Sequence, residues 1–440
     1  MNALTFKRGI HPNYNKDATA SLPIEVMLPE KELVFPMSQH IGAPCTPSVK
    51  KGDYVYVGQE IGTPNGFVSA GIHSSVSGTV KAVEPRMTLK GVKDTCVIVE
   101  NDELYAVQEE KSILPKKMGE PLSKAELIDY VKAAGLVGLG GATFPTHVKL
   151  STPEDKKVEY ILVNGAECEP YLTSDHRVML ERGEEVINGL KILLQVFKEA
   201  KAIIGIEDNK MDAYNHMTKL AEGTPIEVKL LHTKYPQGSE KHLIYALTSR
   251  EVPSGKLPIE VGCIVHNIDS AGAIYRAVVK GEPVMSRIVT VSGKGVKKPC
   301  NLEVKIGTSF RQVLEHAEID LDKTVKIIAG GPMMGTAISD IDVPVVKGTS
   351  AILCFTEEEV KCEAPSNCIR CGKCVSVCPM GLVPSALQKS AIHGHYDEFL
   401  KQNGMDCIEC GCCAYTCPAK RELVQAIRTA KAVIRSRSKK

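Results

Sequence analysis

The sequence predicts a multidomain protein of mixed α/β and α+β class. The chain has 440 residues, which corresponds to three or four domains at about 100 to 200 residues each. Hydrophobic residues make up 43% and charged residues 24% of it, which is an ordinary globular composition. The pattern of apolar residues also changes along the chain, from short strands to alternating strands and helices, and then to a cysteine-rich segment.

Charge and hydropathy narrow the functional classes. The chain carries 54 Lys and Arg against 52 Asp and Glu, a formal net charge of +2, so nothing favours nucleic-acid binding. No apolar run approaches the roughly 20 residues that a membrane-spanning helix needs. Residues 1–10 lack the apolar core of a signal peptide. We therefore expect a cytoplasmic protein, or one held at a membrane only through partners.

After an N-terminal segment (residues 1–29), residues 30–105 are predicted to form a domain of short β-strands. Strand patterns separated by glycine occur at residues 51–58, 60–62, 75–80 and 95–99. The pattern resembles the barrel-sandwich hybrid of biotinyl and lipoyl domains. Those domains carry their cofactor on a lysine, but no lysine lies between Lys51 and Lys81. A docking or scaffolding domain is therefore expected here.

Residues 120–285 alternate helical and strand patterns, which predicts an α/β domain. Ser123 and Glu126 form a capping box at the start of the first helix, and Gly135 ends that helix. Short apolar runs predict strands at residues 158–163, 202–206, 226–231 and 260–265. A long helix over residues 174–198, capped by Ser174, is expected between the first two strands.

A glycine-rich loop, Gly138-Leu-Gly-Gly-Ala-Thr-Phe-Pro-Thr146, follows the first helix. Consecutive glycines let backbone N–H groups approach a phosphate that side chains would keep away. The loop is not the G-x-G-x-x-G fingerprint, because Thr143 takes the place of the third glycine and a helix precedes the loop. From these residues alone, an ordinary glycine turn and a cofactor loop both remain open.

Four segments in the same order as in a known family point to a flavin. The glycine loop with Lys149 resembles the flavin loop of the NADH-oxidising flavoprotein subunit of respiratory complex I, and of the diaphorase subunits of hydrogenases and formate dehydrogenases. Three later segments resemble that family as well: Asn164-Gly-Ala-Glu-Cys-Glu-Pro170, Tyr235-Pro-Gln-Gly-Ser-Glu240 and Val265-His-Asn-Ile-Asp269. The resemblance implies a Rossmann-like domain that binds FMN and NAD(H).

Carried over by position, the resemblance implies residues for each cofactor. FMN would lie near Gly138, Gly140, Gly141, Lys149, Asn164, Glu167 and Asn267. NAD(H) would lie near Phe144, Glu169 and Glu240. The chain departs from the family at Leu139, Thr143, Ala166, Ser239 and His266, where the family has Arg, Gly, Asp, Glu and Asn. No catalytic side chain is expected, since FMN itself would carry the hydride.

Residues 286–350 are predicted to form a small mixed domain. Strand patterns at residues 287–292, 301–306 and 325–329 surround a helix that begins near Ser309. This order resembles the β-grasp domain called SLBB, which the complex I flavoprotein also has between its flavin domain and its clusters. No soluble ligand is expected for it.

The clearest chemical signal is the distribution of the 16 cysteines. Eleven of them lie between Cys354 and Cys417. Two runs, which begin at Cys368 and Cys407, read C-x2-C-x2-C-x3-C-P, the run of bacterial ferredoxins. Residues 357–425 are therefore predicted to be a ferredoxin-like helical domain, internally repeated, with two 4Fe-4S clusters.

In two-cluster ferredoxins the last cysteine of each run ligates the other cluster. By this resemblance one cluster is expected on Cys368, Cys371, Cys374 and Cys417. The second cluster is expected on Cys378, Cys407, Cys410 and Cys413. A pair of zinc ribbons is the alternative, but such sites use two C-x2-C pairs and need no C-x3-C-P arm. Four thiolates for each cluster leave no open iron, so the clusters are expected to relay electrons.

Eight cysteines are left over. Cys412 is one residue out of phase with the ligand pattern and is expected to pack near a cluster without binding it. The others are expected to be buried thiols that behave as small apolar side chains: Cys45, Cys96, Cys168, Cys263, Cys300, Cys354 and Cys362.

The C-terminal tail, residues 426–440, is basic. From Arg428 onward it holds six basic residues and no acidic ones. Leu423, Ile427, Ala430 and Ile434 form a helical stripe beside these charges, which is compatible with contact to anionic lipid or an acidic partner. We expect instead a frayed, solvated terminus.

From end to end, the order of domains resembles the C-subunit family of the membrane-bound Rnf complex. The segments Phe35-Pro-Met-Ser-Gln-His-Ile-Gly-Ala-Pro44 and His73-Ser-Ser-Val-Ser-Gly-Thr-Val80 belong to that pattern. The resemblance implies a peripheral protein on the cytoplasmic face of the membrane, acting within an NAD:ferredoxin oxidoreductase of the ion-translocating (translocase) class. Electrons would pass between NAD(H), FMN and two 4Fe-4S clusters, coupled to Na+ or H+ translocation. Implied partners are the other Rnf proteins: the ferredoxin-like RnfB and membrane proteins such as RnfD and RnfG.

Two other functions remain open at this stage. One is a soluble reductase of the cobalamin-reductase type, which shares the glycine loop and the clusters. Such relatives begin near the flavin loop, so residues 1–105 argue against it. The other is a non-catalytic electron-relay or docking subunit, in which only the clusters work.

Overall fold

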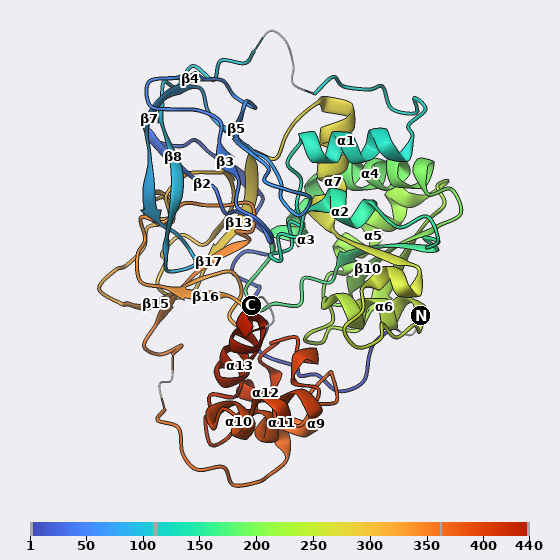
Figure 1. Ribbon diagram of the computed structural model, residues 1–440, viewed down its shortest axis with the longest axis vertical. Helices are drawn as coiled ribbons and strands as arrows, with labels where there is room; N and C mark the ends of the chain where they lie inside the picture. The colour runs from blue at the N-terminus through green and yellow to red at the C-terminus, as the bar shows by residue number, and fades with distance from the viewer. Residues whose placement is uncertain (1–2, 109–112, 361–362, 438–440) are drawn as a thin grey trace.

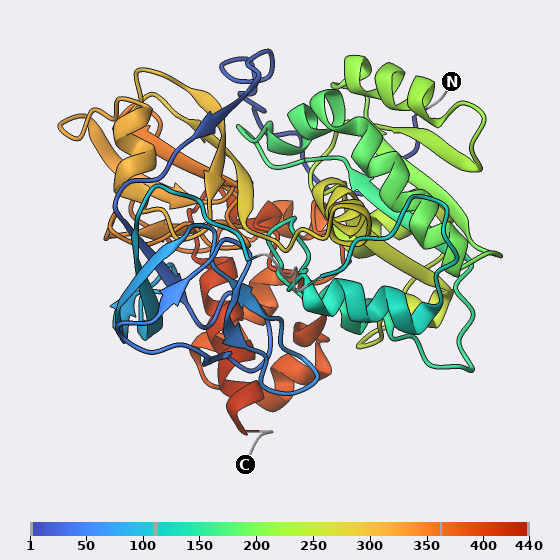
Figure 2. The ribbon, with the colours of Figure 1, turned by 90° about the horizontal axis from the view of Figure 1, so that it is seen from above.

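The computed structural model describes residues 3–108, 113–360 and 363–437. The described chain forms four units (Figure 1): a β-domain, an α/β domain beside it, a second β-rich domain below the first, and a helical domain at the bottom. Viewed from above, the two β-rich domains lie on one side and the α/β domain on the other (Figure 2).

The first unit is built from two small antiparallel sheets, as expected for a barrel-sandwich hybrid. One sheet has the order β2-β8-β7-β4 and the other the order β3-β5-β6. The strands are β2 (Glu32–Pro36), β3 (Thr46–Pro47), β4 (Tyr54–Val55), β5 (Glu60–Thr63), β6 (Ile72–His73), β7 (Gly78–Met87) and β8 (Lys93–Asn101). Apolar side chains from both sheets, such as Phe35, Ile61 and Val99, are fully buried between them.

The α/β domain contains a four-stranded parallel sheet with the order β11-β10-β9-β12. The strands are β9 (Tyr160–Gly165), β10 (Lys201–Glu207), β11 (Ile226–Leu231) and β12 (Cys263–Asn267). The chain moves from β9 through β10 to β11, then returns to the other side of β9 as β12. Parallel α/β sheets bind ligands at such a switch point, outside the carboxyl ends of the strands.

Helices cover this sheet. They are α1 (Lys124–Ala133), α2 (Thr146–Leu150), α3 (Ser174–Glu181), α4 (Gly183–Val196), α5 (Met211–Ala221), α6 (Glu240–Thr248) and α7 (Ile268–Tyr275), which continues as the π-helix η2 (Arg276–Lys280). The capping box of Ser123 and Glu126 at α1 is confirmed. The strand expected at residues 260–265 is shifted, because a 3-10 turn (η1, Pro258–Val261) occupies its start and Gly262, at φ +69°, reverses the chain before β12.

The single helix expected over residues 174–198 is wrong. It is two helices, α3 and α4, separated at Arg182. Gly183, the first residue of α4, lies so close to α5 that a Cβ there would come within 2.7 Å of the Leu220 Cδ1 atom. Ser174 is not the cap either. Thr173 is the N-cap residue, but its hydroxyl donates to Asn301 instead, and the Glu167 carboxylate accepts from the Asp175 N–H at 2.7 Å.

The β-grasp unit is a six-stranded sheet with the order β1-β14-β13-β17-β15-β16. Its elements are β1 (Ile24–Met27), β13 (Ser286–Ser292), β14 (Cys300–Lys305), α8 (Phe310–His316), β15 (Thr324–Ala329), β16 (Thr336–Ile338) and β17 (Ala351–Thr356). Ser309 caps α8, as its position in the sequence suggested. Two strands come from outside residues 286–350: β1 from the N-terminal segment adds an edge, and β17 lies between β13 and β15.

The helical unit at the bottom of Figure 1 carries the two cysteine runs. Its elements are α9 (Lys373–Ser376), α10 (Pro384–Ile392), α11 (Tyr396–Lys401), η3 (Gly404–Asp406), α12 (Cys412–Tyr415) and α13 (Leu423–Arg437). The short helices α9 and α12 occupy the same place in the two runs, as the repeat predicts.

The expectation of a frayed tail is wrong up to Arg437. Residues from Leu423 onward form α13, and its apolar stripe packs inward, with Leu423 at 2% exposure and Ile427 and Ala430 at 1%. Lys431 is buried as well and pairs with Glu409 at 2.6 Å. Tertiary packing therefore orders this part of the tail. The last three positions, residues 438–440, lie outside the described residues.

The N-terminal segment and one buried lysine join the units. Ile10 bridges to Tyr235 of the α/β domain, and the Gly9 N–H donates to Val377 O in the helical domain at 3.1 Å. The Lys347 ammonium, fully buried, donates to Gly71 O and to Gly135 O, which belong to the β-domain and the α/β domain. Burial lowers the pKa of Lys347 to about 8. Within residues 3–108, 113–360 and 363–437, no helix has the length and apolar character to cross a bilayer.

Candidate functional site

A cleft of about 980 Å³ lies where the β-domain, the α/β domain and the β-grasp domain meet. It falls within the size range of cofactor sites. Its lining includes Gly140 and Gly141 of the glycine loop, Glu169, and Glu240 at the start of α6. The β-domain adds Gln39 and His40, and the β-grasp domain adds residues 329–331 and 348–350. Four residues expected from the sequence therefore share one cleft.

The glycine loop is held in place by short hydrogen bonds. The Gly138 N–H donates to Phe144 O at 2.9 Å and the Thr143 N–H donates to Gly138 O at 3.1 Å, which closes the loop on itself. The Leu139 N–H donates to the Ser270 hydroxyl at 2.8 Å. Gly141 has φ +100° and nothing within 4 Å of where its Cβ would be, so its backbone is open on that side. Such a loop can present N–H groups to a phosphate.

The Arg287 side chain links the glycine loop to α7 and to the β-grasp domain. Its guanidinium donates to Leu139 O at 2.6 Å, to the Asp269 carboxylate at 2.5 Å and to Thr349 O at 3.2 Å. Arg276 donates to the second oxygen of Asp269 at 2.7 Å. These two arginines hold the pKa of the buried Asp269 below its usual range, against the effect of burial. The loop thus lies on a rigid, fully paired support.

Asn164 and Asn267 lie side by side at the switch point. They are register partners at the carboxyl ends of β9 and β12. Asn164 donates to Gly238 O at 2.8 Å, and Asn267 caps α7 and donates to Asp175 at 2.6 Å. Burial, together with the nearby charges of Glu167 and Asp269, raises the pKa of Asp175 to about 8. A Cβ on Gly140 would come within 3.2 Å of Asn267 Cβ, so Asn267 packs directly against the glycine loop.

Five expected flavin residues and one expected dinucleotide residue do not line the cleft: Gly138, Lys149, Asn164, Glu167, Asn267 and Phe144. Glu167 turns its carboxylate to the start of α3, where it accepts from the Asp175 and His176 N–H groups. Gly138 and Phe144 close the loop through their backbones. Lys149 lies near the edge, because its ammonium is 3.4 Å from a Glu240 oxygen and donates to Val265 O at 3.1 Å.

Glu169 is the most perturbed acid in the cleft. One of its oxygens accepts from the Met333 N–H at 3.0 Å, and the other has no hydrogen-bond partner among the described residues. Burial raises its pKa to about 7. A Cβ on Gly331 would come within 2.2 Å of a Glu169 oxygen, so only glycine fits opposite it. An unpaired, buried polar atom is the mark of a position built to receive a ligand.

The eight cysteines expected as cluster ligands divide between two hollows of the helical domain. Cys368, Cys371, Cys374 and Cys417 line the first, which we call the outer hollow. Cys378, Cys407, Cys410 and Cys413 line the second, which we call the inner hollow. In each hollow three of the expected ligands come from one run and the fourth comes from the other run; Cys412 also lines the inner hollow.

The two hollows differ in exposure. Cys368 and Cys371 are exposed, whereas Cys378, Cys410 and Cys413 are only 7 to 8% exposed. All eight thiols are free, and each set of four is the donor set of a 4Fe-4S cluster, so the residues fit that cofactor. In the described residues, no three His, Cys, Asp or Glu side chains gather closely enough for a single metal ion.

The inner hollow adjoins the cleft. Ile408, between two of its cysteines, lines both spaces. The Tyr235 hydroxyl donates to Cys410 O at 2.8 Å, and a Cβ on Gly411 would come within 3.1 Å of Met333 O. Cys412 is fully buried against Tyr235, as a packing residue. Cys45, Cys96, Cys168, Cys263, Cys300 and Cys354 are buried as expected, and Cys362 lies outside the described residues.

Sequence reasoning missed the cleft walls that other domains supply. Gln39 and His40 line the cleft. The His40 ring lies 3.2 Å from Ile41 O through Nδ1, and its Nε2 lies 3.2 Å from the Ala70 N–H, which makes Nε2 the acceptor. Burial lowers the pKa of His40 to about 4, so the ring is neutral at pH 7. The only sign of these two residues in the sequence was that Gln39 and His40 are polar neighbours within the segment that follows Phe35.

Comparisons with known families agree with this architecture. Residues 4–104 match the RnfC barrel sandwich hybrid domain, and residues 131–276 match the Nuo51 FMN-binding domain. Residues 288–337 match the SLBB domain, and residues 359–421 match a 4Fe-4S dicluster domain. The expected fold class and cofactor classes are therefore confirmed.

Among solved structures, an NAD+-reducing [NiFe]-hydrogenase chain in its H2-reduced state shares the fold. The TM-score is 0.50 at 17% sequence identity, over 75% of this chain and 68% of that one.

Relatives of known name match the whole chain. The C subunit of the Na(+)-translocating ferredoxin:NAD(+) oxidoreductase complex of Acetobacterium woodii is 48% identical over 437 residues, which cover 99% of this chain and 98% of that one. The C subunit of the proton-translocating complex of Clostridium ljungdahlii is 46% identical, over 97% of this chain and 93% of that one. The C subunit of the ion-translocating oxidoreductase complex of Rhodobacter capsulatus is 40% identical, over 99% and 84%. The chain therefore belongs to the family of C subunits of the ion-translocating ferredoxin:NAD+ oxidoreductase (Rnf) complexes.

Proposed function

We propose that this chain is the NAD(H)-reacting member of an ion-translocating ferredoxin:NAD+ oxidoreductase complex. It exchanges electrons between NAD(H) in the cleft and partner proteins at the helical domain. The observation that carries the proposal is the junction at Ile408, where the cleft lined by the glycine loop meets the hollow lined by Cys378, Cys407, Cys410 and Cys413. A cofactor site and a cluster site that share a wall can exchange electrons directly.

FMN fits the part of the cleft that faces the glycine loop. Gly140 and Gly141 line the cleft and would hold its phosphate through backbone N–H groups. Asn267 packs against Gly140 from outside the cleft lining, beside its register partner Asn164. When bound, FMN supplies the conversion between the two electrons of a hydride and the single electrons that a 4Fe-4S cluster accepts. Lys149 and Glu240, paired at the edge, would separate to admit a charged ligand.

NAD(H) is the ligand that the remaining volume suits. Glu169 and Glu240 present two carboxylates to the cleft, and carboxylates are the usual acceptors for ribose hydroxyls. The neutral His40 and the Gln39 side chain form the opposite wall. Phe144 lies outside the cleft lining, so it is the weakest of the three expected dinucleotide residues. The role of the protein in the hydride step is to align the two rings and to exclude water.

The positions of the two thiol sets suggest a path by which electrons leave the cleft. The inner hollow would hold the first cluster, on Cys378, Cys407, Cys410 and Cys413. The outer hollow would hold the second, on Cys368, Cys371, Cys374 and Cys417. Electrons would leave through the outer set, where Cys368 and Cys371 are exposed. The translocase class of the complex, the partners RnfB, RnfD and RnfG, and a place on the cytoplasmic face of the membrane are part of the same proposal.

An anaerobic reconstitution tests the proposal. The purified chain, loaded with iron and sulfide, is expected to bind FMN, and NADH is expected to bleach the cluster absorbance. The test variant is Gly141→Val, which adds a side chain where the open loop would meet FMN and replaces no cysteine. It should keep its clusters and lose flavin and NADH-driven bleaching. A wild-type chain that binds clusters but no flavin would leave the non-catalytic relay function instead.

A further inference from the structure

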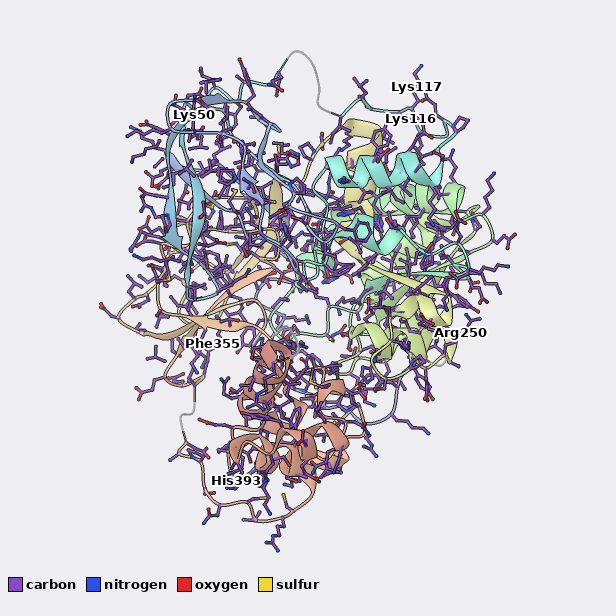
Figure 3. All side chains as sticks on the ribbon, in the orientation of Figure 1. Lys50, Lys116, Lys117, Arg250, Phe355 and His393 are labelled. Carbon is purple, nitrogen blue, oxygen red and sulfur yellow. The ribbon has the colours of Figure 1, made fainter. Side chains whose placement is uncertain are left out.

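The outer hollow opens at the end of the molecule opposite the β-domain. His393, which lines it, lies at the bottom of Figure 3, whereas Lys50 and Lys117 lie at the top. Two apolar side chains flank the opening without covering it. Ile369 is 66% exposed and Ile392 is 56% exposed. Exposed aliphatic side chains of this size beside exposed thiols form a surface that a partner could bury.

The charges on this surface are all of one sign. Arg370, Lys389 and Arg421 line the hollow, and no Asp or Glu does. Within the described residues, Arg370 and Lys389 form no ion pair, and Arg421 donates to the Gln388 amide oxygen at 3.2 Å and to Ser366 O at 3.4 Å. Three cations therefore face the opening with no carboxylate to neutralise them.

Neutralising a bound cluster does not account for these cations. A negatively charged cluster is more costly to hold in the inner hollow, because that hollow is buried. Yet the inner hollow is lined by thiols and apolar side chains, with no Lys or Arg among them. Lys431, which donates to Cys407 O at 2.6 Å, is already paired with Glu409. One further cation lies near the inner hollow, since Arg8 donates to Cys378 O at 3.4 Å from outside the lining. Three cations without an ion pair among the described residues line the exposed outer hollow, where a partner can reach them.

We propose that the surface formed by Ile369, Arg370, Lys389, Ile392 and Arg421 docks an electron-transfer protein whose own face presents carboxylates around an apolar centre. The proposal rests on the proposed function only in taking the outer hollow as a cluster site. The cations steer the approach and set the orientation, and the two isoleucines supply apolar area to bury. Such a contact brings the partner against the exposed thiols of Cys368 and Cys371.

Binding measured against a small acidic two-cluster bacterial ferredoxin, used as the probe, tests the proposal. The reconstituted full chain carries either Arg370→Glu with Lys389→Glu or the control pair Lys50→Glu with Lys117→Glu. Both pairs make the same change in net charge, and the control pair lies at the opposite end of the molecule (Figure 3). At low salt the first pair should raise the dissociation constant about 10-fold or more, an effect that salt should shrink, and the control less than about twofold.

Several results would overturn the proposal. Equal weakening by both pairs, or no weakening by the first, would mean that this surface does not select an acidic protein. If the Arg370→Glu and Lys389→Glu changes weakened binding to phosphatidylglycerol vesicles but not binding to the ferredoxin, the surface would be assigned to a membrane. Electron paramagnetic resonance checks that both clusters remain in each variant. If Arg370→Glu disturbs a cluster, the binding measurement with Lys389→Glu alone tests the proposal. Failure of the proposed function is separate, since it would show in the wild-type chain as missing flavin.

Discussion

Replacing Arg287 by methionine is expected to destabilise the protein by about 3–5 kcal/mol, because it breaks a buried ion pair and hydrogen-bond network. Arg287 is 2% exposed and reaches three elements at once: Leu139 of the glycine loop, Asp269 of α7 and Thr349 of the β-grasp domain. Methionine fills similar space but donates no hydrogen bond. Two buried carbonyls would each lose a donor, at about 1–3 kcal/mol apiece. Asp269 keeps Arg276, so no carboxylate is left wholly unpaired.

The assay is guanidinium denaturation combined with a flavin titration followed by FMN fluorescence. Because the loop loses its support, FMN binding should weaken by about 10-fold, or ~1.4 kcal/mol. Arg311→Met is the matched control. Arg311 pairs with Asp342 at 2.6 Å on the surface, with side-chain exposures of 46% and 62%. Its loss should leave the denaturation midpoint close to that of the wild type, because exposed ion pairs contribute little. If the two variants had equal stability, or if Arg287→Met kept full flavin affinity, the structural reasoning would be refuted.

Two further predictions concern the thiols and the cleft acid. Cys417→Ala should remove the same cluster as Cys368→Ala, with loss of about half the bound iron, since both thiols line the outer hollow. An electron paramagnetic resonance spectrum that matched that of Cys413→Ala would instead place Cys417 in the same cluster as Cys413. For Glu169, whose pKa is raised from 4.5 to about 7, the folded state holds a proton that the unfolded chain releases, so stability falls as pH rises through that window. Glu169→Gln should remove this part of the pH dependence of stability. The measurement compares the denaturation midpoints of the variant and the wild type at pH 5 and pH 8. If the two proteins showed the same pH dependence, Glu169 would ionise normally.

The helices and strands followed the sequence wherever local chemistry sets them. The capping box at Ser123 and Glu126 is confirmed, because a cap depends on residues three positions apart. The helix expected near Ser309 is confirmed as well. The helix over residues 174–198 was wrong for the opposite reason. Its break at Arg182 is followed by Gly183, which packs against α5, and its first turn is capped by Glu167, seven residues before α3 begins. Neither contact has a local signature.

The tail shows the same limit. Its six basic residues suggested a solvated end, but Ile427 and Ala430 pack against α10 and Lys431 pairs with Glu409. A helical stripe in a sequence predicts an apolar face. It does not say whether a neighbour exists to cover that face.

The sequence by itself determined the chemistry of this protein. The spacing of the cysteines and the order of the glycine loop and its companion segments were enough for the cofactors and the family, because ligand identity and spacing are properties of the chain. Only the tertiary structure decided where that chemistry occurs. The cleft takes walls from three domains, burial raises the pKa of Glu169 against the effect of its hydrogen bond from Met333, and Ile408 lines both the inner hollow and the cleft. These features depend on contacts between residues far apart in the chain, which packing alone creates.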